Sequence, residues 1–471
     1  MLKYTGVFGG VQVLKALAGL IRNKLTAILL GTAGMGLNAV FQNIGELIFS
    51  ATNMGIPFSS TRNLSESYEQ QDGKATTALV QVIRTWALWT ALVAALMCLV
   101  GAWGLDWYFF SDKGHSHLLE IMLLSLYVMS LPLEAAECAI LKGTRQLKSV
   151  ATVETVAAFG TILCTVPFYW LWGIRGVAVS LVVCGWMVVG VHAVYTLRLY
   201  PYRVKPFQTD MLRNGLPLLR LGIPYMMAAA AGALSTSLIY GFLSGESEIG
   251  MYKAAYSMIV TYAGMAFVAL DNDFFPRLAA INNQRDNRNY AINQQIQVCC
   301  LLSGIMMSFM VMIMPWLIEM LLSKEFLPAV PIATAGAFYI YMRSVNLPLG
   351  YLSLARGESK IFLLLEVLYD ILAVALVGIG YKLYGLLGCG IALSAAGIAE
   401  SLILLVTYGI RYQFRLESKT VFYLIGMALL LGSPSSPPYH ENLGFDGSLQ
   451  CRKMAAASSS VDTCRPNSSG R

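Results

Sequence analysis

Charge is scarce in this sequence. Only 13% of the 471 residues are Asp, Glu, Lys or Arg, whereas 56% are hydrophobic and the mean hydropathy is +0.61. A soluble domain usually has about 25% charged residues. The shortage therefore excludes an ordinary soluble protein. It is typical of a polytopic membrane protein, in which most residues face lipid or other helices.

Signals for catalysis, metal binding and export are scarce as well. The chain has nine cysteines, but none has the spacing of metal ligands or of a redox motif. Most lie in apolar segments, where cysteine behaves as a small hydrophobic residue. No A-x-A-like site follows the first apolar segment, so we expect no cleavable signal peptide. The loops between apolar segments leave no large soluble domain, so we expect neither an enzyme nor a metal site.

Long apolar runs dominate the chain instead. A helix needs about 20 apolar residues to cross a hydrocarbon core of roughly 30 Å, and an isolated strand cannot satisfy its backbone in lipid. Runs separated by polar turns therefore predict an all-α integral membrane protein with twelve spanning helices. They cover roughly residues 7–31, 36–58, 78–104, 117–141, 150–171, 175–197, 217–243, 248–275, 293–322, 327–355, 361–381 and 386–410.

Basic residues are unevenly distributed over the connections between these spans. Eighteen Lys and Arg residues lie on the side of the N-terminus, and four lie on the other side, namely Lys113, Arg175, Lys324 and Lys382. Because Lys and Arg are enriched in cytoplasmic loops, this split predicts a cytoplasmic N-terminus. The formal net charge of +7 is thus a topology signal, and we expect no nucleic-acid partner.

The chain also repeats itself at a nearly constant spacing. LPLEAAECAILKG (131–143) recurs as LPLGYLSLARG (347–357), and the pair Gly173 and Gly176 recurs 212 residues later as Gly385 and Gly388. Each repeat holds six spans, an even number, so both halves begin on the same side. We therefore expect two parallel six-helix repeats around a central cavity, a plan that suits alternating access in transporters.

The repeat sets the expected domain boundaries. Residues 1–200 form an N-terminal six-helix lobe, 201–216 a cytoplasmic linker and 217–412 a C-terminal six-helix lobe. Residues 413–432 contain an apolar run too short for an ordinary span, which we interpret as a truncated thirteenth helix. Residues 433–471 lack apolar periodicity, so we interpret them as a disordered tail, with a non-native, out-of-frame or vector-derived end as the alternative.

Several segments carry a resemblance to a known family. They are the opening helix with its cations, GESEIGMYKAAYS (245–257), DNDFFPRLAAI (271–281), and the paired turns LKGTRQLKSV and LARGESKIF. With these segments the chain resembles the polysaccharide transporter (O-antigen flippase) family of the multidrug/oligosaccharidyl-lipid/polysaccharide exporter superfamily. The likeness extends over about residues 5 to 415.

The resemblance implies a function and its partners. A member of this family would move undecaprenyl-pyrophosphate-linked oligosaccharide repeat units across the bacterial inner membrane. Its partners would be that lipid-linked substrate, membrane lipid, and the polysaccharide polymerase and chain-length machinery. No cofactor is implied, although some relatives couple transport to H⁺ or Na⁺.

Cations inside the predicted spans are the main candidates for the site. A charge at mid-membrane is costly and normally faces a water-filled cavity or a partner. Lys15 and Arg22 lie seven residues apart, within about 20° on one helical face. A guanidinium matches phosphate oxygens in a bidentate manner. We predict a cationic cavity that binds an anionic headgroup, formed by Lys15, Arg22, Lys253 and Arg343.

Each of these cations has an alternative interpretation, a structural ion pair with an acid on a neighbouring helix. Lys24 points about 200° away from Arg22 and is expected to extend towards the outer end, and Arg84 is expected to extend towards the cytoplasmic end. Glu154 is expected near a helix N-terminus, where the helix dipole favours a carboxylate. Glu366 and Asp370 lie one turn apart and are candidates for ion coupling.

Other classes of function are weaker interpretations. A drug/cation antiporter of the same superfamily should favour acids and aromatics in its site over buried cations. A transporter of the major facilitator type usually has a basic, glycine-rich turn between spans two and three. The corresponding segment of this chain, SSTRNLSESYEQQDGKA, lacks that turn. A polysaccharide polymerase or a glycosyltransferase is the remaining, least favoured interpretation.

Overall fold

The structure is a computed structural model that describes residues 2–70, 73–110, 116–201, 209–264, 267, 274, 277–278, 281, 284–356 and 358–432. Within these residues it contains helices and turns but no strands. The elements are α1 (Leu2–Thr52), α2 (Ile56–Glu69), α3 (Gly73–Phe110), α4 (Leu118–Gly143), α5 (Leu147–Trp172), η2 (Gly173–Arg175), α6 (Gly176–Leu199), α7 (Thr209–Phe242), α8 (Glu246–Tyr256), η3 (Ser257–Tyr262), α10 (Arg285–Leu321), η4 (Lys324–Ala329), α11 (Val330–Ala355), α12 (Ser359–Tyr412) and α13 (Ser418–Gly432).

The all-α membrane fold is confirmed in its class. Six helices among the described residues are long and apolar enough to cross a membrane, so the chain is a multi-pass membrane protein. They are Leu14–Thr52, Gly73–Phe110, Leu118–Gly143, Lys148–Leu199, Arg285–Leu321 and Lys360–Tyr412. Three of them are 39, 52 and 53 residues long, about twice the length that a single crossing needs. The count of twelve spans stays a prediction.

Glycines break the longest helices where the sequence predicts separate spans. Gly31 in α1 and Gly385 in α12 have φ values of 65° and 59°, close to the φ of 54° at Gly173 between α5 and α6. Such positive φ values favour glycine because it has no Cβ. Gly173 and Gly385, which the sequence repeat pairs, therefore make the same kind of turn.

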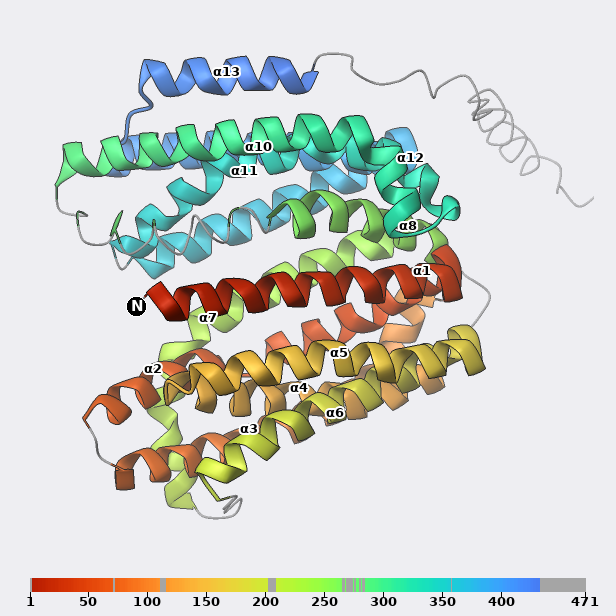
Figure 1. Cartoon of the computed structure of the whole chain (residues 1–471), viewed down its shortest axis with the longest axis vertical. Coiled ribbons are helices and arrows are strands. Elements are labelled where there is room, and N and C mark those ends of the chain that lie inside the picture. The colour runs from red at the N-terminus through yellow and green to blue at the C-terminus, as the bar shows by residue number, and fades with distance from the viewer. Residues whose placement is uncertain are drawn as a thin grey trace, which may run out of the picture. The chain divides into compact units, whose positions relative to one another are not determined.

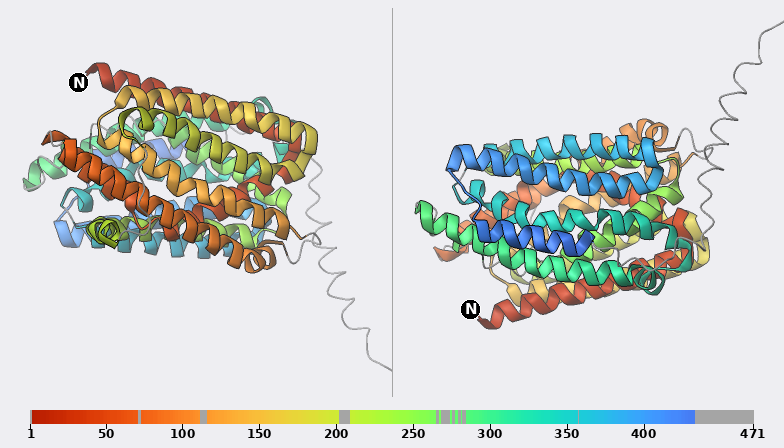
Figure 2. Two further views of the ribbon diagram at one scale, coloured as in Figure 1. Left: turned by 90° about the horizontal axis from the view of Figure 1, so that it is seen from below. Right: turned by 90° about the horizontal axis from the view of Figure 1, so that it is seen from above.

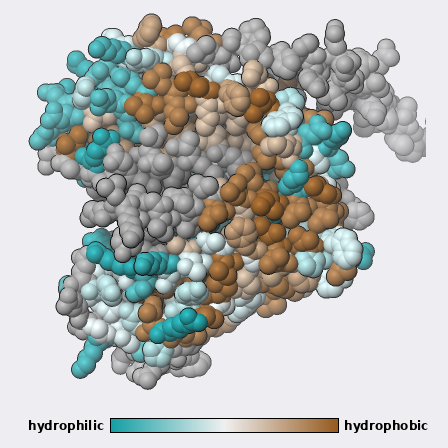
Figure 3. All heavy atoms as spheres, viewed as in Figure 1, coloured by the Kyte–Doolittle hydropathy of each residue, from teal (hydrophilic) through white to brown (hydrophobic). Residues whose placement is uncertain are grey.

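Within residues 1–432 the helices lie side by side, and most run nearly parallel or antiparallel to α1 (Figures 1 and 2). We call the end that holds the turns at Gly31, Gly173 and Gly385 and the first residues of α4 and α8 the distal end. The opposite end is the proximal end. On the face in Figure 3, hydrophobic residues gather between hydrophilic residues at the two ends, as expected for a membrane-embedded bundle.

The short helix α13 corresponds to the predicted truncated helix. It packs against α10, where Gln297 Nε2 donates to Thr420 Oγ1 at 2.9 Å, and against α11, where Tyr341 Oη donates to the Leu424 carbonyl at 2.7 Å. The predicted tail, 433–471, lies outside the described residues.

Two glycines let α1 and α8 approach closely. A Cβ atom on Gly36 would collide with the Glu246 carbonyl, and one on Gly250 would collide with the Thr32 carbonyl. Gly36 and Gly250 are 214 residues apart, and so are Thr32 and Glu246. The contact is therefore reciprocal, as between two units related by a two-fold axis.

Arg84 is a structural residue, and the expectation that it extends towards the cytoplasmic end is wrong. Its side chain is only 2% exposed and forms a bidentate ion pair with Glu137 of α4, at 2.8 and 3.0 Å. It also donates to the carbonyls of Tyr200 and Pro201. A carboxylate within reach satisfies the guanidinium inside the bundle, so it does not need to reach the interface.

Candidate functional site

Arg22 and Lys253 bring two positive charges together between α1 and α8. Arg22 lies within electrostatic range of Lys253, and these two helices pack against each other. Within the described part of the chain, neither side chain has a hydrogen-bond or ion-pair partner. Two like charges in an apolar bundle repel each other and lack hydration, so an anion between them would be strongly stabilised.

Lys15 has a different environment from Arg22, although both lie on one face of α1. Its Nζ atom lies 2.7 Å from Glu154 Oε2, with the two side chains 39% and 20% exposed. Glu154 is the eighth residue of α5, too far from the helix start for the expected dipole interaction. That expectation is wrong, and the partner of Glu154 is Lys15. A substrate role for Lys15 stays a prediction.

Next to this ion pair, three side chains could supply metal ligands. The ligand atoms of Cys138, Glu154 and His192 all lie within 4.8 Å of one another. His192 Nδ1 is 2.9 Å from the Val188 carbonyl, so in the neutral ring Nδ1 donates to this carbonyl and Nε2 is the acceptor. However, Lys15 already neutralises Glu154. We therefore assign the cluster a structural role.

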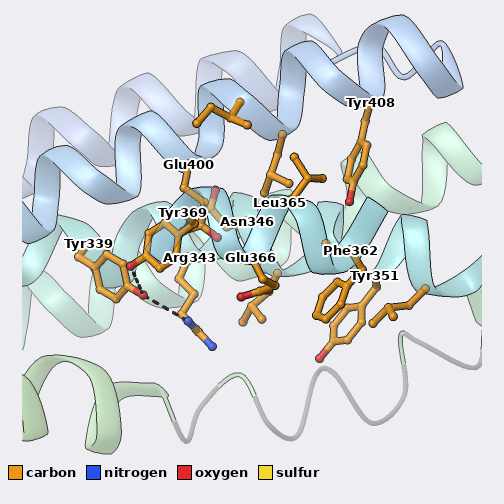
Figure 4. Close-up of a pocket in the computed structure, with 15 residues that line it drawn as sticks. Tyr339, Arg343, Asn346, Tyr351, Phe362, Leu365, Glu366, Tyr369, Glu400 and Tyr408 are labelled. Carbon is orange, nitrogen blue, oxygen red and sulfur yellow. Dashed lines mark hydrogen bonds between the residues drawn. The ribbon is translucent and has the colours of Figure 1, made fainter. Parts of the chain in front are cut away.

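A cavity of about 280 Å³ lies between α11 and α12 (Figure 4). Regular helical spacing produces its walls. Tyr339, Arg343, Asn346 and Gly350 are three or four residues apart on α11 and so share one face. The first half of α12 contributes Phe362, Leu365, Glu366 and Tyr369, and its second half contributes Glu400, Ile403, Leu404 and Tyr408.

Tyrosine hydroxyls hold Arg343 in this cavity. Arg343 Nη1 donates to Tyr339 Oη at 3.4 Å, and Tyr369 Oη donates to Tyr339 Oη at 3.1 Å (Figure 4). Glu400 also acts on Arg343 electrostatically, but no ion pair within 4.0 Å joins them in the described chain. Among the described residues the guanidinium therefore has a single, long hydrogen bond and keeps donors for a ligand.

The acids of the cavity differ in how far they are satisfied. Glu400 Oε2 accepts a 2.7 Å hydrogen bond from Asn346 Nδ2, and Asn346 Oδ1 accepts one from Ser401. Glu366 lines the cavity, yet its carboxylate has no hydrogen-bond or ion-pair partner among the described residues. Asp370 is within electrostatic range of Glu366, but it lies against α7 rather than in the cavity wall.

The sequence identified six of the residues described above as site candidates, but not their arrangement: Lys15, Arg22, Lys253, Arg343, Glu366 and Asp370. Arg22 and Lys253 are 231 residues apart, and nothing in their local patterns predicts that they meet. Tyr339, Tyr369 and Asn346 were not among the predicted site residues, although Tyr339 lies four residues before Arg343 and Asn346 three residues after it. That spacing in an apolar segment was the available signal.

Another group missed by the sequence lies at the distal end. His117, just before α4, is 3.2 Å from Glu246 of α8 and 3.8 Å from Glu120. The hydrogen bond to Glu246 raises the pKa of His117, and the charges of Glu246, Glu120 and Asp106 raise it further against the opposing effect of burial. When it is protonated, His117 forms an ion pair with Glu246 that links α4 to α8.

Known structures share this fold. A lipid II flippase MurJ in an inward closed conformation matches with a TM-score of 0.69 at 15% identity, covering 92% of both chains. An inward-facing multidrug resistance MATE transporter of the MOP superfamily matches at 0.68 and 12% identity, covering 89% of this chain and 96% of its own. A MOP superfamily transporter from Pyrococcus furiosus, described as having a binding pocket of reverse polarity, matches at 0.56 and 13% identity, covering 90% and 94%.

The sequence comparisons identify a family. No curated protein matches the chain. A family model described as "Polysaccharide biosynthesis protein" matches residues 1–282, more than half of the sequence. The chain therefore belongs to this family of polysaccharide biosynthesis proteins.

Proposed function

We propose that this protein is a flippase for undecaprenyl-pyrophosphate-linked oligosaccharide repeat units, such as those of O-antigen. Two parallel six-helix repeats would expose the central site alternately to the two sides of the bacterial inner membrane, with the N-terminus in the cytoplasm. The polysaccharide family and the fold shared with a lipid II flippase support transport of a lipid-linked precursor.

The observation that carries the proposal is the proximity of Arg22 and Lys253, neither of which has an ion-pair partner among the described residues. A pyrophosphate carries at least two negative charges, and it must leave water to cross the membrane. Fixed cations can offset the cost of that desolvation, whereas the lipid tail can remain in the bilayer. Arg22 adds bidentate geometry for phosphate oxygens. In this proposal Lys15 orders the neighbouring helices through Glu154 and contributes positive potential.

Ion coupling belongs to the proposal as well. Glu366 and Asp370 lie within electrostatic range of each other in an apolar bundle, so they could exchange a proton or hold Na⁺ during the cycle. We further propose that the product is delivered to the polysaccharide polymerase and the chain-length machinery.

The alternative is a multidrug/cation antiporter. One observation favours it: the cavity between α11 and α12 combines the acids Glu366 and Glu400 with several aromatic rings. Such a site suits an apolar cation. The two functions differ in the charge of the ligand and can be separated by direct binding.

The test uses purified protein in nanodiscs, with undecaprenyl pyrophosphate and tetraphenylphosphonium as probes. We expect the pyrophosphate lipid to bind and Arg22→Glu to weaken it at least tenfold, because one charge-assisted contact becomes a repulsion. Arg22→Lys should give a smaller loss, since it keeps the charge but not the bidentate geometry.

Lys24→Ala is the matched control, because Lys24 donates to the Met320 carbonyl of α10 and not to this site. In cells lacking the gene, wild-type protein and Lys24→Ala should restore surface polysaccharide, and Arg22→Glu should not. Tight binding of tetraphenylphosphonium without binding of the pyrophosphate lipid would establish the antiporter instead.

A further inference from the structure

The cavity between α11 and α12 has the chemical composition of a carbohydrate site. Its lining includes five aromatic rings, those of Tyr339, Tyr351, Phe362, Tyr369 and Tyr408. Among these rings lie charged and amide groups that can donate or accept hydrogen bonds. A sugar ring presents hydroxyl groups at its edge and C–H groups on its faces, so it needs both kinds of surface.

We propose that this cavity binds the first sugar of the lipid-linked substrate, as a neutral sugar ring. This inference rests on the proposed flippase function and deepens it. The volume of about 280 Å³ is just below the range of about 300–1,000 Å³ for pockets that hold drug-sized ligands. The cavity therefore accommodates a single ring better than a whole oligosaccharide.

The position of the cavity fits the chemistry of the substrate, in which the first sugar is bonded directly to the pyrophosphate. Lys253 and Tyr256 lie three residues apart on one face of α8, a rise of about 4.5 Å. Tyr256 is within electrostatic range of both Tyr339 and Arg343 at the cavity wall. The α8 helix, which carries Lys253, also packs against α11, which forms one wall of the cavity.

The α8 helix changes its geometry directly after Tyr256. It continues as the π-helical segment η3, Ser257–Tyr262. A π-helix is rare and is frequently found at functional sites, because its wider turn shifts side chains relative to an α-helix. Here the π-helical segment packs against α11, which forms one wall of the cavity.

The charges in the cavity favour a neutral ring over an anionic one. Two carboxylates, Glu366 and Glu400, face it beside the single cation Arg343. Glu366 has both oxygens free within the described chain and is suited to accept two hydroxyl hydrogens. Arg343 can donate to a further hydroxyl, since its hydrogen bond to Tyr339 is long at 3.4 Å.

The test compares two probes on the full-length protein in nanodiscs. One is undecaprenyl pyrophosphate, and the other is the same lipid carrying one sugar. The sugar is N-acetylglucosamine or galactose, and the one that the wild-type protein binds more tightly is used for all variants. We expect the sugar to strengthen binding about tenfold in the wild type, the size of one charge-assisted hydrogen bond. Glu366→Gln and Phe362→Ala should each remove most of this gain. Phe362→Ala, which changes no charge, should also leave the affinity for the sugar-free lipid unchanged.

Glu319→Gln is the matched control, since this carboxylate pairs with Lys324 at the surface of the distal end. It should keep the full gain, whereas Arg22→Glu should weaken both probes equally. Equal binding of both probes to the wild type, or a full gain in both cavity variants, would overturn the sugar site while the flippase proposal stands. If neither probe binds, the proposed function fails. If Glu366→Gln alters only the pH or Na⁺ dependence, the cavity couples ions and the sugar site is wrong.

Discussion

At the residue scale, Lys15 and Arg22 show how one helical face can hold two kinds of cation. Both lie on the same side of α1, as their spacing predicts. Lys15 has a carboxylate at 2.7 Å, whereas Arg22 lies within electrostatic range of the like charge of Lys253 and has no ion-pair partner among the described residues. The position of a residue on a helix determines the direction in which its side chain points. The neighbouring helix determines whether a cationic side chain forms a structural ion pair or is available to bind a substrate.

This difference predicts that Lys15 contributes mainly to stability. Lys15→Ala should reduce the free energy of unfolding by about 1–3 kcal/mol, between the values for exposed and buried ion pairs, because it leaves Glu154 without its counter-charge. The double variant Lys15→Ala/Glu154→Gln should recover much of the loss. Thermal unfolding in detergent, followed by size-exclusion chromatography, measures both. If Lys15→Ala abolishes transport at an unchanged melting temperature, Lys15 belongs to the substrate site.

The partners of charged residues could not be predicted from the sequence. Glu154 is 139 residues from Lys15, and Glu137 is 53 residues from Arg84. No local pattern encodes such pairs, because they arise only when separate helices pack together. The presence of cations within apolar spans did indicate that each needs a partner or a cavity.

At the element scale, apolar length and glycine positions carried most of the information. Some predicted spans coincide with described helices, such as 117–141 with α4 and 327–355 with α11, because each run has to satisfy its backbone internally. Glycine marked the breaks in α1 and α12, which the positive φ values at Gly31 and Gly385 explain. The π-helical turn in η3 had no such signal, since its sequence, SMIVTY, is compatible with an ordinary α-helix.

The close contact of α1 with α8 gives a prediction at this scale. Gly36→Ala and Gly250→Ala should each destabilise the protein by about 1–3 kcal/mol. The new methyl group would collide with a backbone carbonyl, which, unlike a side chain, cannot avoid the clash by changing its rotamer. Gly190→Ala is the matched control, since it has open space in α6. It should be neutral or stabilising by about 0.5–1 kcal/mol. Equal melting temperatures for all three variants would contradict this account of the packing.

At the scale of the whole molecule, the distal contacts between α1, α4 and α8 bear on alternating access. In the proposed cycle, α8 belongs to the C-terminal half and α4 to the N-terminal half. The reciprocal contact of Gly36 and Gly250 and the bond between His117 and Glu246 join these halves at the same end. Opening that end therefore requires both contacts to break, and the histidine is the part that responds to pH.

The sign of this response follows from the raised pKa of His117. The stabilisation by charged His117 is fully present below its ordinary pKa of about 6.5 and is lost as the pH rises through the raised value. The groups that face the ring are Glu246 of α8, Glu120 of α4 and Asp106 of α3, together with the rings of Phe41 and Phe110. All three acids favour the charged form, so the contact between the halves should be strongest at acidic pH.

Spin labels can measure this opening. Leu119 in α4 and Leu383 in α12 are 79% and 68% exposed near the distal end, so cysteine at both positions should accept labels without disturbing the core. In a background without the native cysteines, we expect two populations of electron–electron distance, a short one for the closed distal end and a longer one for the open end. The short population should dominate near pH 6. The longer population should grow as the pH rises through the raised pKa of the histidine. His117→Gln should abolish this pH dependence, because glutamine cannot become charged. An unchanged pH response in His117→Gln would show that another group controls the distal contact.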